Sequence, residues 1–105
     1  MTPEFNTAFS SYCDHIRALI AAYWERNKFT HSAPPAVEFT EGPKYFRVII
    51  ADALGTSRSV HTFVDKTTGD IYKGSWKAPV KNGKRGNIFG DYVGKVTEHG
   101  AKYLR

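Results

Sequence analysis

The sequence has a single cysteine and no long apolar run, and these absences exclude several classes of protein. One thiol, Cys13, cannot close an internal disulfide or supply a cysteine-based zinc site. No stretch approaches the roughly 20 apolar residues that cross a bilayer. Met1 to Phe9 lack the basic start and apolar run of a secretory signal. We therefore expect a cytoplasmic protein that makes no contact with a membrane.

Motifs for catalysis and for cofactors are also missing. No serine lies in a nucleophile elbow, and the four histidines have no metal-ligand spacing. Asp65, Asp70 and Lys73 loosely resemble a nuclease arrangement. Asp70 and Lys73 are three positions apart, however, which places them on opposite faces of a strand. A role in a hairpin turn is the simpler interpretation of both aspartates, so we expect no catalytic site, no metal and no cofactor.

The length and the charge point to one domain with an uneven surface. A chain of 105 residues supports one hydrophobic core, so residues 1–105 are taken as a single domain. Residues 1–43 carry 3 Lys and Arg against 5 Asp and Glu, whereas residues 44–105 carry 12 against 5. The basic second part indicates a polyanionic partner. Alternatively, the lysines only keep the protein soluble, and this explains the same charge equally well.

An amphipathic helix is predicted over residues 3–28. Thr2 can cap its start, and Pro3 suits its first position. Apolar residues then recur at steps of three and four, which places them along one side of a helix. These residues are Phe5, Phe9, Tyr12, Ile16, Leu19 and Tyr23.

Short runs of β-branched and aromatic residues predict an antiparallel meander of three to four strands over residues 36–76. The turn before the last strand carries Gly69, which suits a positive φ angle. The predicted fold class is therefore α+β, with the helix on one face of the sheet. From residue 77 to residue 105 we expect a basic, glycine-rich loop and an irregular segment, with residues 92–95 as an edge strand.

Alternation along the strands divides the side chains of the sheet between two faces. Val60 and Thr62 are assigned to the helix side. The far face then holds Tyr45, Arg47, His61, Phe63 and Tyr72. Rings mixed with cations on an open sheet hold single-stranded nucleic acid, because bases stack on rings and phosphates meet charges. Alternatively, the C-terminal segment covers this face and makes it a second layer of core.

The stretch from Lys73 to Asn87 is a second candidate site. Glycines let a backbone approach a phosphate, lysines supply charge, and Trp76 can stack on a base. The alternative is a solvated basic loop that Trp76 anchors. Together, the candidate nucleic-acid-binding residues are Arg47, His61, Phe63, Tyr72, Lys73, Trp76, Lys77, Lys81, Lys84 and Arg85.

One pattern resembles a group of known sequences. Residues 65–79 read D-x-x-T-G-D-I-Y-K-x-S-W-K-A-P, and residues 85–89 read R-G-N-I-F. The pattern is similar to one in small bacteriophage proteins, those of cyanophages included, whose function is not assigned. The resemblance extends over roughly residues 36–92. It implies a viral source and the cytoplasm of a host cell, and it transfers no catalytic residue.

Two hypotheses from different classes follow. The first is a non-catalytic phage accessory protein that binds single-stranded DNA or RNA, with a steep dependence on salt. The second is a module that binds a host or virion protein, with a homodimer through an exposed sheet edge as one version. It predicts salt-tolerant binding to one partner and indifference to nucleic acid.

Overall fold

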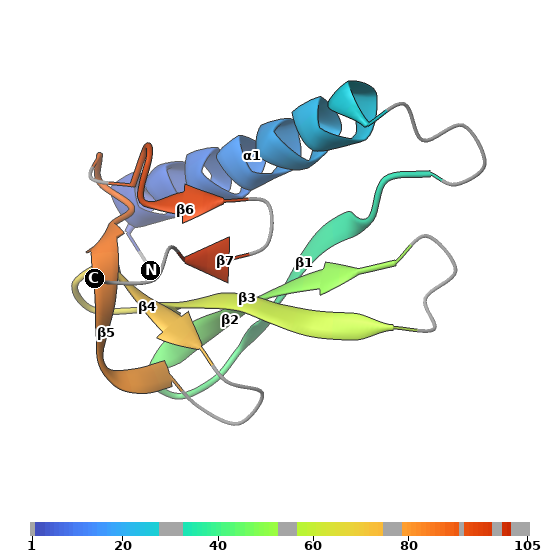
Figure 1. The fold of residues 1–105 in the computed structure, drawn as a ribbon. Coiled ribbons are helices and arrows are strands. Elements are labelled where there is room, and N and C mark those ends of the chain that lie inside the picture. The colour runs from blue at the N-terminus through green and yellow to red at the C-terminus, as the bar shows by residue number, and fades with distance from the viewer. Residues whose placement is uncertain are drawn as a thin grey trace.

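One long helix lies across one face of an antiparallel sheet (Figure 1). The structure is a computed structural model, and it describes residues 2–27, 33–52, 57–74, 79–90, 92–97 and 100–101. The α+β class predicted from the sequence is confirmed. Among the described residues, no helix combines the length and the apolar character that a bilayer crossing requires.

Helix α1 (Pro3–Arg26) begins where the sequence predicts and ends within two residues of the predicted end. The Thr2 side-chain oxygen accepts a hydrogen bond from the Phe5 N–H at 3.1 Å, which caps the first turn. Asn27 is the C-cap, and its N–H donates to the carbonyl of Tyr23. The buried residues follow the predicted spacing and are Phe5, Phe9, Tyr12, Cys13, Ile16 and Ile20.

The main sheet has five antiparallel strands in the order β1-β2-β3-β4-β5, so each strand pairs with its neighbours along the chain. The strands are β1 (Ala36–Glu41), β2 (Tyr45–Ala51), β3 (Arg58–Asp65), β4 (Asp70–Gly74) and β5 (Pro79–Asn87). The turn between β3 and β4 holds Gly69 at a φ of +78°, as predicted. The turn expected at residues 54–56 lies outside the described residues.

The fifth strand corrects the sequence-based prediction, which placed a loop after residue 77. β5 pairs with β4 from Asp70 opposite Asn87 to Gly74 opposite Pro79, with two register irregularities between. Lysine and glycine weaken the strand signal in this stretch. An edge strand tolerates both residue types, because one of its sides pairs with no other strand. Register shifts then accommodate residues that do not fit the regular pairing.

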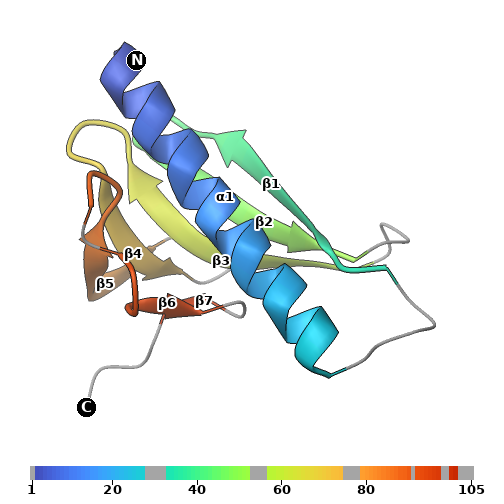
Figure 2. The same cartoon turned by 90° about the horizontal axis from the view of Figure 1, so that it is seen from above.

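The C-terminal segment lies on the α1 side of the sheet, as Figures 1 and 2 show. Ile88 and Val96 are buried in the core cluster that contains the helix residues. Strands β6 (Val96–Thr97) and β7 (Gly100–Ala101) form a small hairpin there. The edge strand expected at residues 92–95 is wrong: the Lys95 N–H donates to the Tyr92 carbonyl at 2.9 Å and closes a turn.

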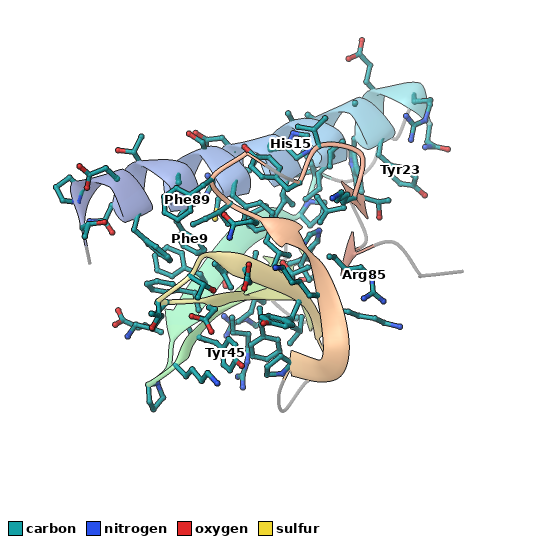
Figure 3. The ribbon with its side chains drawn as sticks, turned by 90° about the vertical axis from the view of Figure 1, so that its left-hand side faces the viewer. Phe9, His15, Tyr23, Tyr45, Arg85 and Phe89 are labelled. Carbon is teal, nitrogen blue, oxygen red and sulfur yellow. The ribbon has the colours of Figure 1, made fainter. Side chains whose placement is uncertain are left out.

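Aromatic rings fill the core between α1 and the first strands. The Phe9 and Phe46 rings stack with centroids 4.6 Å apart, and Phe5 lies 5.9 Å from Phe46. Phe89 completes the cluster from the C-terminal segment, with its ring 6.1 Å from that of Phe5 (Figure 3). Phe5, Phe9 and Phe46 are buried, and such rings remove a large apolar area from water in a small core.

Candidate nucleic-acid interface

A bulge in β3 decides which side chains face away from α1. Val48 pairs with Thr62, but the next residue, Ile49, pairs with Val60, so His61 is an extra residue on β3. Alternation stops at the extra residue of a bulge. As a result His61 and Thr62 both turn toward α1, and Val60 turns to the far face. The sequence-based assignments of His61 and Val60 are therefore wrong.

His61 is buried in a chain of hydrogen bonds and only 3% exposed. Its Nε2 lies 2.7 Å from the Thr97 carbonyl, which only accepts, so Nε2 carries the proton. Its Nδ1 lies 3.0 Å from Oγ1 of Thr62, and that oxygen lies 2.6 Å from the Tyr12 hydroxyl. His61 thus joins α1, β3 and β6, and it cannot reach a ligand on the far face.

The far face carries a cluster of aromatic rings. The Tyr45 ring lies 6.0 Å from both the Phe63 and the Tyr72 rings, at angles of 81° and 84°. Figure 3 shows Tyr45 on the side of the sheet opposite α1. Phe63 is only 4% exposed and forms the floor, whereas Tyr45 and Tyr72 are half-buried and offer ring surface.

Cations lie over two of these rings. The Lys44 ammonium lies 5.4 Å from the Tyr45 ring centroid, and the Arg47 guanidinium lies 5.6 Å from that of Phe63. Lys84 pairs with Tyr72 across β4 and β5, so it shares their face. We call this surface, made of Lys44, Tyr45, Arg47, Phe63, Tyr72 and Lys84, the ring face.

Two aspartates flank the ring face, Asp65 opposite Tyr45 at the end of β3 and Asp70 at the start of β4, and both are engaged. The Asp65 carboxylate accepts hydrogen bonds from the Thr67 and Thr68 N–H groups at 2.7 and 3.0 Å, which caps the hairpin turn. Asp70 pairs with Lys84 at 3.2 Å. Partial burial pushes the pKa of Asp70 upward, but hydrogen bonds from Asn87 and Lys84 outweigh it and hold that pKa below its usual value. Among the described residues no group of three His, Cys, Asp or Glu could hold a metal ion.

Other candidates from the sequence lie elsewhere. Lys73 pairs with Thr62 and therefore points to the α1 side of β4. Arg85 is an extra residue at a register shift, and it projects from β5 away from Tyr45 (Figure 3). Trp76 and Lys77 lie outside the described residues, and the structure describes only the backbone of Lys81. The predicted residues that the ring face brings together are Arg47, Phe63, Tyr72 and Lys84.

A cavity of about 500 Å³ opens at the β2 end of the ring face. The sequence-based prediction took Lys44 as the first residue of the strand and did not assign its side chain to the far face, whereas in the structure Lys44 precedes β2 and lines the cavity. Pro79 closes the cavity from β5, and no local signal connects it with Lys44. The lining residues are Thr40, Glu41, Gly42, Pro43, Lys44, Tyr45, Arg47, Phe63 and Pro79.

Comparisons with known proteins add one finding. A family model, described as a family of unknown function (DUF7717), matches residues 4–103. The search of curated proteins gave no match. The search of solved structures gave none either.

Proposed function

The chain belongs to this family of unknown function, and we propose that it binds single-stranded nucleic acid through the ring face. The observation that carries the proposal is the pair of half-buried rings, Tyr45 and Tyr72, with the Lys44 ammonium over Tyr45 and the Arg47 guanidinium over the neighbouring Phe63 ring. A base can stack on a tyrosine ring while the flanking phosphates meet the cations.

The form of the ring face favours a single strand over a duplex. The Tyr45 and Phe63 rings line a cavity, so only bases that have left a stack can lie against them. The bases of a duplex are already stacked and paired, so only phosphates would be offered to the face. Ring stacking and phosphate contacts do not depend on the identity of the base, which supports binding with little sequence preference.

The proposal extends to the source and the mode of action. The resemblance of residues 65–79 and 85–89 to bacteriophage sequences supports a phage accessory protein that acts in the cytoplasm of its host. The role is one of binding without catalysis. The engagement of the Asp65 and Asp70 carboxylates within the fold supports this part of the proposal.

The test is fluorescence anisotropy with labelled single-stranded DNA, single-stranded RNA and duplex DNA at about 50 and 200 mM salt. We expect single-strand binding that weakens steeply with salt. The double variant Lys44→Gln/Lys84→Gln should lower the slope of log affinity against log salt by about 1.4, or about 0.7 for each phosphate that the protein no longer neutralises. Arg26→Gln/Lys95→Gln, which removes the same charge elsewhere, is the matched control and should change the slope far less.

Two outcomes would contradict the proposal. The first is a lack of single-strand binding at the lower salt. The second is an equal loss in the two double variants, because binding would then depend on total charge and not on the ring face.

A protein-binding module is the second candidate, and Phe39 is the observation that favours it. Phe39 lies on the edge strand β1, is 52% exposed and lines a cavity between α1 and β1. The edge is partly blocked, because Arg17 donates a hydrogen bond to the Val37 carbonyl at 3.3 Å. Loss of partner capture in Phe39→Ser, with single-strand affinity unchanged, would support this candidate.

A further inference from the structure

The cavity at the β2 end of the ring face has walls that are fixed before any ligand binds. The turn after β1 closes through a hydrogen bond of 2.9 Å from the Gly42 N–H to the Tyr45 carbonyl. Lys66 holds the same turn, because its ammonium donates to the Gly42 carbonyl at 3.1 Å and its N–H donates to the Lys44 carbonyl at 2.9 Å. A turn held at three points gives a preformed wall, which reduces the entropy lost on binding.

The polar groups that reach this cavity are mainly donors. Thr40 pairs with Arg47 across β1 and β2, so both side chains lie on the cavity side, and Lys44 lies at the rim. Glu41 contributes to the wall, but its carboxylate is bonded to Lys66. Lysines, arginines and hydroxyls directed at one space favour an anion there.

Cations lie at both ends of the ring face. At the β4 end, Lys84 pairs with Asp70 at 3.2 Å. At the cavity end, Lys44 and Arg47 belong to the lining. Among the described residues of that lining, Glu41 supplies a carboxylate, and this carboxylate pairs with Lys66.

The remaining lining is apolar and partly aromatic. Tyr45 and Phe63 contribute ring surface, and Pro43 and Pro79 contribute flat apolar surface. The volume of about 500 Å³ lies within the range of small-molecule sites. A ligand that fits both the donor groups and the apolar lining of the cavity has an anionic group and a flat ring system.

We infer that this cavity holds one nucleotide unit of the bound strand, with its base on Tyr45 and its 5′-phosphate between Lys44 and Arg47. The inference rests on the proposed function and deepens it, because it names the unit that anchors the strand. Neighbouring nucleotides then extend along the ring face toward Tyr72 and Lys84. A free 5′-mononucleotide carries the same two groups and binds the same place more weakly.

The test uses amide chemical-shift titrations of the whole protein with four probes: dTMP, AMP, thymidine and inorganic phosphate. We expect both nucleotides to shift the amides of Gly42, Lys44 and Tyr45. Thymidine and phosphate each supply only one of the two groups, so each should bind at least about fivefold more weakly than dTMP. Labelled single strands are titrated in parallel by anisotropy.

Substitutions of two exposed lysines distinguish binding at the cavity from binding along the rest of the ring face. Lys44→Gln should weaken both the mononucleotide and the single strand. Lys84 lies on the ring face but outside the cavity lining. Lys84→Gln should therefore weaken binding of the single strand and leave binding of the mononucleotide unchanged. The amide spectrum of each variant checks that it remains folded.

The outcomes distinguish the inference from the proposed function. Tight binding of single strands with no mononucleotide shifts at the cavity would overturn the inference and leave the function standing. Mononucleotide binding at the cavity, with single strands binding no more tightly, would support the nucleotide site and overturn the strand-binding function. Equal shifts from phosphate alone would reduce the site to an adventitious anion and overturn the inference.

Discussion

The hydroxyl of Tyr12 lies 2.6 Å from Oγ1 of Thr62, and both side chains are fully buried between α1 and the sheet. With a neutral His61 ring, the neighbours fix the direction of this bond. His61 donates to the Thr97 carbonyl through Nε2, so its Nδ1 accepts from the Thr62 hydroxyl. Tyr12 is left to donate to Thr62. One directed chain of hydrogen bonds thus connects the helix with the bulge and with β6.

Removal of the Tyr12 hydroxyl should destabilise the fold. In Tyr12→Phe the buried Oγ1 of Thr62 loses a donor, and we expect a loss of about 1–3 kcal/mol in the free energy of unfolding, measured with urea. Thr62→Val is the second arm of a double-mutant cycle. The double variant should cost less than the sum of the two single variants, because the two groups interact directly. Strict additivity would show that the pair is not coupled.

The carboxylate of Asp65 should matter for stability and not for any activity. Asp65→Ala leaves the Thr67 and Thr68 N–H groups without their acceptor, so we expect a loss of about 1–3 kcal/mol in urea denaturation. Asp65→Asn retains an acceptor oxygen in the same turn and should lose clearly less. Equal losses in the two variants would contradict the capping role.

A side chain at Gly74 should disturb the floor of the ring face. A Cβ at this position would lie 2.6 Å from the Phe63 ring and 3.0 Å from Val60. In Gly74→Ala the Phe63 ring must move, and overpacking of this kind costs about 1–3 kcal/mol. Gly42→Ala is the control, since its nearest contact would be the Tyr45 carbonyl at 3.3 Å. Thermal unfolding compares the two, and a smaller loss in Gly74→Ala would contradict the packing described.

Alkaline pH should weaken the fold through Cys13. Burial raises the pKa of its thiol from 9.0 to about 11. The folded state therefore keeps the proton that the unfolded state releases. The associated stability is complete below about pH 9 and is lost as the pH rises toward 11, by at most about 2–3 kcal/mol.

Urea titrations at several pH values test this expectation. Cys13→Ala lacks the thiol, so its stability should fall less steeply between pH 9 and 11 than that of the unaltered protein. Burial also raises the pKa of Tyr12 above its ordinary value of 10.0, so some loss should remain in the variant. Identical slopes would show that the thiol is not protected.

The sequence predicted those elements that local chemistry determines. The helix followed from the spacing of Phe5, Phe9 and Tyr12, and the hairpin turn followed from Gly69. Each of these signals lies within a few residues of the structure that it produces. The same holds for Tyr45 and Arg47, whose strand runs without interruption and keeps its alternation.

The errors arose where contacts between segments that are distant in the sequence determine the structure. Alternation assumes that a strand has no extra residue, and no glycine marks the bulge at His61, so its side chain was assigned to the wrong face. Similarly, β5 is a strand because β4 offers it an open edge, although its own lysines and glycines predict a loop. The cavity between Lys44 and Pro79 exists only after β5 has paired, which no local pattern reveals.

The order of the strands has a consequence for how the chain folds. Each strand of the meander pairs with its neighbour in sequence, so the ring face requires only short loops to close. The opposite side is different, because α1 meets Ile88 and Val96 from the far end of the chain. Closing so long a loop is entropically costly and slow. During synthesis on the ribosome, the surface proposed to bind a strand would therefore assemble first, and the two ends of the chain would seal the core last.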